Sequence, residues 1–132
     1  RSAKKFTYFN IDLTDKKELS ELINELQPQF IINTAAMTNV DTCELNKEAS
    51  DKINVDVVKY LVELCELNDI HLIHLSTDFI FDGDKGYYKE SDPANPVNYY
   101  GVSKLRSEKS IINSNIKYTV LRTILVFGIA TV

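Results

Sequence analysis

The chain has 132 residues, of which 44% are hydrophobic and 26% are charged. This composition is typical of a soluble domain with a core, and it excludes disordered, collagen-like and membrane-embedded chains. The net charge of -4 provides no positive surplus for a nucleic-acid backbone or an anionic membrane surface, so we expect neither as a partner.

Strand-like and helix-like segments alternate in the first half of the chain. Residues 6–11 are short, aromatic and β-prone, and they predict a strand. A capping box at Asp15 opens a run of apolar residues at helical spacing that ends at Pro28. The apolar run 30–32 is typical of a strand buried on both faces. Residues 46–68 predict a helix whose apolar residues cover more than one narrow stripe, so it should bury two faces.

The second half continues the alternation around one long loop. We predict a strand at 71–75, a loop at 76–98, a helix at 99–113 and a strand at 118–121 that continues over residues 124–127. Strands with continuous apolar cores, separated by helices, favour an α/β fold with a parallel sheet. Ligands of such sheets bind beyond the carboxyl ends of the strands.

Tyr100 and Lys104 are the first candidate chemical pair. They are four positions apart at the start of a predicted helix, so their side chains should share one face. An ammonium near the phenol would lower the pKa of the tyrosine from its usual value of about 10 and make it a usable proton donor. A hydroxyl at the end of the preceding strand, Ser76 or Thr77, could hold a substrate carbonyl beside it. Alone, YxxxK often arises by chance on a solvent-facing helix.

Eight motifs, one of which contains this pair, follow one another along nearly the whole chain. They are Asp12-Leu13, Asn33-Thr34-Ala35-Ala36, Thr38-Asn39-Val40-Asp41, Cys43-Glu44, Asn54-Val55, Ser76-Thr77-Asp78-Phe79-Ile80-Phe81-Asp82-Gly83, Tyr99-Tyr100-Gly101-Val102-Ser103-Lys104 and Leu121-Arg122-Thr123. In this order they resemble the extended short-chain dehydrogenase/reductase family, and within it the dTDP-4-dehydrorhamnose reductases. The resemblance implies a partial Rossmann-like domain over residues 1–132, with a parallel sheet flanked by helices.

The resemblance also implies roles for individual residues. Tyr100 would protonate the carbonyl being reduced, Lys104 would tune Tyr100 and hold the nicotinamide ribose, and Thr77 would orient the substrate carbonyl. Asp78 and Arg122 would contact the substrate. The implied cofactor is NADP or NAD, with NADPH slightly favoured, and its binding residues beside Tyr100 and Lys104 would be Asp12, Leu13, Thr34, Ala35, Ala36 and Thr38.

Several of these residues also have purely structural interpretations. Asp12 could cap the first helical region, and Ala35 and Ala36 could serve tight strand-to-helix packing. Thr77 and Asp78 could be turn formers that bond the local backbone. The two histidines are expected in the core or at a sheet edge, without a metal role, and no metal site is expected.

The chain departs from the family in its glycines. No glycine precedes Gly83, so the phosphate-binding turn that opens a helix after the first strand is missing. We therefore expect an internal piece, from the third to the sixth strand, that lacks the first two strands and the C-terminal substrate domain and is inactive alone. Leu125 stands where the reductases usually carry an aromatic residue, which would remove a stacking surface for the sugar.

The missing strands bear on the middle of the sheet. In the strand order 3-2-1-4-5-6 they would lie between residues 6–11 and residues 30–32. We expect either that these two segments pair directly or that another chain, in a possible homodimer, covers the exposed edge.

The leading function is NAD(P)H-dependent reduction of the 4-keto group of a nucleotide-linked deoxysugar. The alternatives are a nucleotide-sugar epimerase or dehydratase of the same family, and a non-catalytic subunit that resembles the beta subunit of methionine adenosyltransferase. Cys43 and Cys65 lack CxxC spacing, and no leader-like segment precedes the first element, so we expect reduced thiols in the cytoplasm, although a bridge between them stays open.

Overall fold

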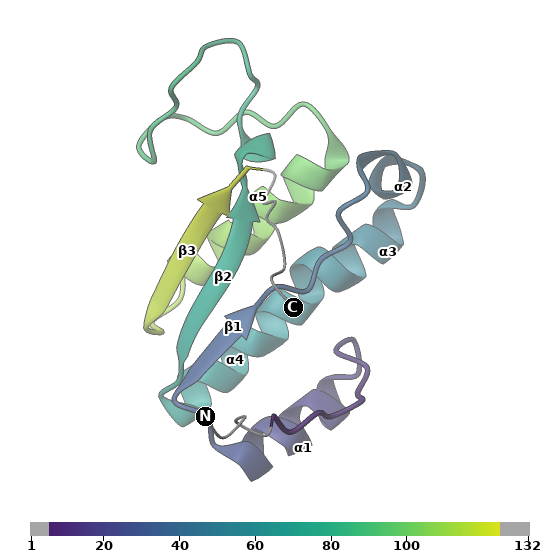
Figure 1. Ribbon diagram of the computed structural model, residues 1–132, viewed down its shortest axis with the longest axis vertical. Coiled ribbons are helices and arrows are strands. Elements are labelled where there is room, and N and C mark those ends of the chain that lie inside the picture. Colours follow the sequence, from purple (N-terminus) through teal and green to yellow (C-terminus); the bar gives the residue numbers. More distant parts are fainter. Residues whose placement is uncertain (1–5, 125–132) are drawn as a thin grey trace, which may run out of the picture.

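Three parallel strands form the sheet of the computed structural model, which describes residues 6–124. Their order is β1 (Phe30–Asn33), β2 (His71–Thr77) and β3 (Tyr118–Thr123). Helices α4 (Val57–Asn68) and α5 (Tyr99–Ile112) lie behind the sheet in Figure 1. The α/β fold with a parallel sheet flanked by helices is therefore confirmed.

The prediction of a strand at residues 6–11 is wrong. The segment has no strand conformation, and Phe6 and Tyr8 are 93% and 85% exposed. A strand persists only when its backbone groups bond a neighbouring strand, and β1 pairs with β2 alone among the described strands. The prediction that this segment pairs directly with β1 is wrong for the same reason. Coverage of the β1 edge by another chain stays a prediction.

Helix α1 (Lys16–Leu26) begins at the predicted cap. The Asp15 carboxylate accepts hydrogen bonds from the backbone N–H groups of Lys17 and Glu18. The Glu18 carboxylate reaches back to the N–H of Asp12 at 3.0 Å rather than to the cap residue itself. These bonds satisfy amides that have no partner within the helix.

A short helix, α2 (Val40–Leu45), was not predicted. It begins where the Asn39 side chain accepts from the N–H of Thr42 at 2.8 Å. The predicted helix at 46–68 is present as α3 (Lys47–Asp51), a π-helical turn η1 (Lys52–Asp56) and α4. The buried residues of α4 form the main apolar core together with Leu19 and Ile23 of α1.

The start and the end of the long loop lie in close contact. Strand β2 runs into a 3-10 turn, η2 (Asp78–Ile80), and α5 begins at Tyr99 after the loop. A Cβ on Gly101 would lie 2.1 Å from the carbonyl oxygen of Phe79, so only glycine allows this approach of helix and turn. Strand β3 reaches Thr123, and its predicted continuation falls from residue 125 onward outside the described residues.

The two cysteines, Cys43 and Cys65, are both buried and free, and burial raises the pKa of the Cys65 thiol to about 11. Within residues 6–124, no helix has the length and apolar character needed to cross a membrane. The same residues contain no cluster of three or more His, Cys, Asp or Glu side chains suited to a metal ion.

Candidate active site

Thr77 and Tyr100 lie in one pocket although they are 23 positions apart in the sequence. Thr77 ends β2 and Tyr100 lies in the first turn of α5, which starts beside that strand end. The pocket has a volume of about 380 Å³ and is also lined by Ser76, Thr38 and Thr123. Four hydroxyl-bearing side chains therefore join the phenol at the carboxyl ends of β2 and β3, where α/β folds bind ligands.

Two titratable residues line this pocket, Asp78 and the candidate proton donor Tyr100. Tyr100 is 9% exposed, and this burial raises its pKa above the ordinary value, while a hydrogen bond with the Thr77 side chain acts in the opposite direction. The Phe79 ring packs edge-on against it, with centroids 5.8 Å apart. The tyrosine is therefore a neutral phenol at pH 7 and can donate its O–H.

Lys104 is bonded to β2. Its ammonium donates to the carbonyl oxygen of Leu75 at 2.7 Å, and its Nζ lies 3.1 Å from Nε2 of His74. Burial lowers the pKa of Lys104 to about 8, with Glu108 acting in the opposite direction. The pKa of Tyr100 is raised by burial rather than lowered as the spacing suggested, and the roles of Lys104 toward Tyr100 and the nicotinamide ribose stay predictions.

Thr77 and Asp78 have the local bonds expected of turn formers. The Thr77 hydroxyl accepts from the N–H of Phe79 at 3.2 Å and lies 3.1 Å from the Asp78 carboxylate, to which it donates. Thr77 is nevertheless part of the pocket wall, so the turn presents its hydroxyl next to Tyr100. Its role toward a substrate stays a prediction.

The loop after β1 carries the other predicted cofactor residues. Its backbone is fixed at two points, since the N–H of Ala35 donates to Oδ1 of Asn33 at 3.1 Å and the N–H of Met37 donates to Oδ1 of Asn54 at 2.8 Å. Ala35 and Ala36 are half-buried, whereas Thr34 and Thr38 are exposed, and only Thr38 lines the Tyr100 pocket.

Asp12 and Leu13 do not line the pocket that contains Tyr100. The Asp12 carboxylate accepts from the N–H and the hydroxyl of Thr14, both at 2.8 Å, and these hydrogen bonds lower its pKa. Leu13 packs against the apolar core. Asp12 therefore bonds a local turn and does not cap α1, whose cap is Asp15, and adenine binding by Asp12 and Leu13 stays a prediction.

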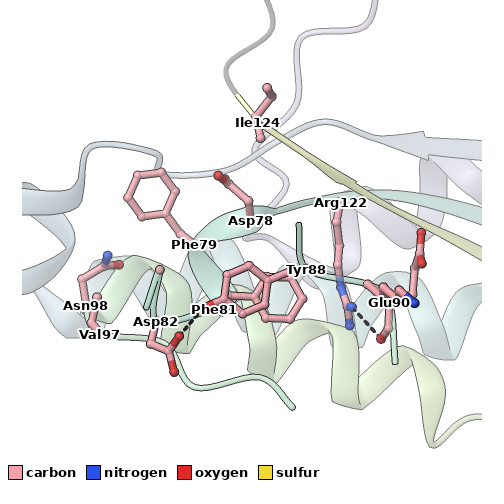
Figure 2. A pocket seen from close by; sticks show the side chains of 12 residues that line it. Asp78, Phe79, Phe81, Asp82, Tyr88, Glu90, Val97, Asn98, Arg122 and Ile124 are labelled. Carbon is pink, nitrogen blue, oxygen red and sulfur yellow. Dashed lines mark hydrogen bonds between the residues drawn. The ribbon is translucent and has the colours of Figure 1, made fainter. Parts of the chain in front are cut away.

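A second cavity of about 520 Å³ lies under the long loop, and Figure 2 shows its side chains. The rings of Phe81 and Tyr88 stack in it at 4.4 Å, and the Arg122 guanidinium lies 5.5 Å from the centre of the Phe81 ring. Arg122 also donates to the buried Glu108 carboxylate at 2.8 Å and to the Glu90 carbonyl at 3.1 Å. The guanidinium is thus held by the protein, and substrate contact by Arg122 stays a prediction.

Three buried polar residues near the site were not predicted as part of it. Asn33, His74 and Ser107 form a hydrogen-bonded line with Lys104 inside the molecule. The sequence offered one signal: His74 alternates with Leu72 and Ser76 along β2, and all three face inward. A histidine at such a position requires polar partners, but the sequence does not reveal that they come from β1 and α5.

Parallel strands connected by helices, with a pocket at the strand carboxyl ends, define an α/β domain of the Rossmann-like class. Residues 2–131 match the family described as the RmlD substrate binding domain, and the chain belongs to that family.

The chain spans about two fifths of the length of its relatives. It is 38% identical over 122 residues to a dTDP-4-dehydrorhamnose reductase of Aggregatibacter actinomycetemcomitans, covering 92% of this chain and 42% of that protein. It is 34% identical over 118 residues to the methionine adenosyltransferase 2 subunit beta of Bos taurus, covering 89% and 35%.

Solved structures show the same fold. A hypothetical dTDP-4-dehydrorhamnose reductase from Sulfolobus tokodaii superposes with a TM-score of 0.84 at 42% identity, covering 94% of this chain and 45% of that one. A dTDP-4-dehydrorhamnose reductase from Bacillus anthracis, solved in complex with NADP, gives a TM-score of 0.86 at 30% identity, with coverage of 92% and 43%. The family resemblance inferred from the motifs is therefore confirmed.

Proposed function

We propose that the protein containing this chain reduces the 4-keto group of a nucleotide-linked deoxysugar with NADPH or NADH. Tyr100 donates its phenolic proton to the carbonyl oxygen, and Thr77 holds that oxygen in place. The reduced cofactor supplies the hydride that the carbonyl carbon receives. The carbonyl thereby gains one hydride and one proton and becomes an alcohol, and Tyr100 regains its proton from solvent.

The observation that carries the proposal is the shared pocket of Thr77 and Tyr100. Burial raises the pKa of the phenol, so the proton is present at pH 7, and the Thr77 hydroxyl belongs to a residue that lines the same pocket. A carbonyl oxygen that accepts from Tyr100, and from Thr77 once that hydroxyl turns from Asp78, is stabilised as negative charge develops on it. The named relatives and NADP-bound neighbour support the same chemistry.

The residues present fit one end of a nicotinamide cofactor. The Ser76 hydroxyl is buried and has no hydrogen-bond partner among the described residues, and it lines the Tyr100 pocket with Thr38. Such an unpaired buried group calls for a ligand or water. Thr38, Tyr100 and Lys104 are the groups we assign to the nicotinamide ribose, and Thr34, Ala35 and Ala36 to the neighbouring cofactor surface.

Replacement of Tyr100 tests the proposal. In the polypeptide encoded by the complete reading frame, Tyr100→Phe removes the proton donor and should lower kcat by about 10²- to 10⁴-fold, measured as NADPH oxidation with dTDP-4-dehydro-6-deoxysugar. Tyr99→Phe is the matched control, because Tyr99 is the neighbouring phenol but does not line the pocket. Equal rates in the two variants, or an inactive parent protein, would contradict the proposal.

A non-catalytic subunit is the second candidate, and it is supported by the similarity to methionine adenosyltransferase 2 subunit beta. In that case the pocket would bind a nucleotide without turning it over. This function would be favoured if the complete protein binds NADPH but does not oxidise it when a nucleotide-linked keto sugar is added. Tyr100→Phe should then change neither the binding of NADPH nor its oxidation.

A further inference from the structure

Glu108 and Arg122 form an ion pair between α5 and β3. The Glu108 side chain is 1% exposed and the Arg122 side chain is 23% exposed. Nε of Arg122 donates to Oε1 of Glu108 at 3.1 Å, and Nη2 donates to Oε2 at 2.8 Å. Two such parallel bonds fix the plane and the direction of a guanidinium. Because a buried carboxylate without a partner is strongly disfavoured, Glu108 holds Arg122 in this orientation.

The Arg122 guanidinium extends from this pair to the long loop. Its Nη1 donates to the Glu90 carbonyl at 3.1 Å. Its central carbon lies 5.5 Å from the centre of the Phe81 ring, a distance at which a cation is attracted to an aromatic face. Phe81 in turn stacks on Tyr88 (Figure 2). Arg122 therefore contacts the loop at two separate points.

The other hydrogen bonds in the middle of the loop stay within it. Tyr88 and Asn95 both donate to the Asp82 carboxylate, which joins parts of the loop to one another. Among the residues that the structure describes, Arg122 is the only one outside the loop that hydrogen-bonds residues 81–92. The orientation of Arg122 therefore fixes where this segment lies on the domain.

The segment forms a wall of the cavity of about 520 Å³. The two stacked rings and Arg122 line that cavity, and Asp78 and Phe79 line both it and the pocket of Tyr100. The two spaces therefore adjoin. Glu108 does not line the larger cavity, so its influence on a ligand there has to pass through Arg122.

We propose that Glu108 is a positioning residue that acts through Arg122 to hold residues 81–92 as a wall of the larger cavity. The inference rests on the proposed function, in which the keto carbonyl lies at Tyr100 and the rest of the nucleotide-linked sugar extends into the adjoining cavity. A displaced wall would weaken substrate binding. It would leave the Tyr100 pocket intact, because α5 and η2 touch there independently of the loop.

Two substitutions loosen the ion pair from its two ends. Glu108→Gln keeps the size of the side chain but removes its negative charge and one of the two acceptor oxygens. Arg122→Lys keeps the positive charge but removes the planar group that bonds Glu108 and the Glu90 carbonyl together. Arg106→Lys is the matched control, because Arg106 of α5 also pairs with a carboxylate, that of Asp51, and does not line the cavity.

Hydrogen exchange of the complete protein reports how firmly the loop is held, without turnover. The backbone amides of residues 81–92 should exchange about tenfold faster in both variants, since a charge-assisted contact is lost. The amides of α4 should not change, and Arg106→Lys should match the parent. Unchanged exchange in the loop would overturn the proposal. Equally faster exchange in α4 would overturn it too, because the ion pair would then stabilise the whole domain. If Glu108→Gln does not fold, Arg122→Lys gives the answer.

The kinetic test uses the complete protein with NADPH and dTDP-4-dehydro-6-deoxysugar. Both variants should raise the KM for the keto sugar about tenfold and change kcat less than about twofold, the pattern of binding lost equally in the ground and transition states. A raised KM with unchanged loop exchange would indicate direct substrate contact by Arg122 and overturn the positioning role. A tenfold loss of kcat would place the effect at Tyr100 and overturn it as well. If the parent reduces no keto sugar, the proposed function fails, and the exchange result still decides whether Glu108 holds the loop.

Discussion

Helices α4 and α5 lie behind the same sheet (Figure 1), but their buried sides differ in polarity. The buried side of α4 is apolar throughout, and it consists of Val57, Val58, Leu61, Val62, Leu64 and Cys65. The buried side of α5 is mostly polar, and it includes Ser103, Lys104, Ser107 and Glu108. One sheet face is therefore divided between an apolar half and a polar half.

The apolar half and the polar half contribute differently to the stability of the domain. Burial of apolar area contributes about 25 cal/mol per Å², and this is the main gain available to α4. Buried polar groups stabilise little, and they are tolerated only when they are hydrogen-bonded. The polar groups of α5 meet this condition: Asn54 donates to Ser103 at 2.9 Å, and Arg122 pairs with Glu108. We infer that α4 holds the domain together and that α5 organises the pocket.

The largest expected effect on stability comes from a substitution in the apolar half. Leu61 of α4 is 4% exposed, and Leu61→Ala should lower the free energy of unfolding by about 2–5 kcal/mol, because a buried side chain is lost and a cavity remains. Leu67→Ala on the same helix is the control, since Leu67 is 79% exposed and its loss should cost less than about 0.5 kcal/mol. Urea unfolding measures both, and similar losses would contradict the division.

The polar half should differ from the apolar half in how its contribution to stability depends on pH. Burial lowers the pKa of Lys104 from 10.5 to about 8, so between these values the unfolded chain binds more protons than the folded one. Stability contributed by this group therefore rises with pH in that window. Relative to Lys104→Met, the parent should gain about 1–2 kcal/mol between pH 8 and pH 9.5.

Urea midpoints of the two proteins at each pH measure this gain, and their difference removes the titration of all other groups. Lys59→Met on α4 is the control, because it removes the same charge from a side chain that is 48% exposed. A difference for Lys104→Met that changes with pH no more than this control does would show that the ammonium is not held in a desolvated site.

The smallest expected effect concerns the starts of the two helices. Asn98 caps α5 by accepting from the N–H of Gly101 at 2.8 Å, so Asn98→Ala should cost about 1 kcal/mol. Helix α4 continues from the π-helical turn, and Asp56 at its start makes no capping bond. Asp56→Ala removes only a surface pair with Lys59 and should cost less than about 0.5 kcal/mol. Thermal unfolding of both variants is the measurement, and the reverse ranking would contradict the cap.

Local patterns predicted most of the elements. Helical spacing and the Asp15 cap located α1, and the run of apolar residues located α4 and β2. Helix α2 was missed because it has only six residues, which is too short for a periodicity to show, although Asn39 was a readable cap. The strand at residues 6–11 failed because β conformation depends on a partner strand that a local pattern cannot supply.

The sequence predicted that Thr77 lies beside Tyr100, and both line one pocket, but the sequence did not predict the contacts of Lys104. The spacing of Tyr100 and Lys104 correctly placed them in one helix. Their contacts differ from the expected ones: burial raises the pKa of Tyr100, and the Lys104 ammonium donates to the Leu75 carbonyl of β2. Such a contact is fixed by the packing of α5 on β2, and no spacing within a single helix encodes it.

The contact between Gly101 and the Phe79 carbonyl has a consequence for the loop that leaves η2 and returns at α5. Because the helix and the turn touch there, and the N–H of Asn95 also bonds the Ile80 carbonyl at 2.9 Å, both ends of the loop are anchored independently of what lies between them. The entropy of closing a loop grows only slowly with its length. Residues 83–87 are exposed and therefore form the segment of the domain in which insertions can be accommodated while Thr77 and Tyr100 keep their relative positions.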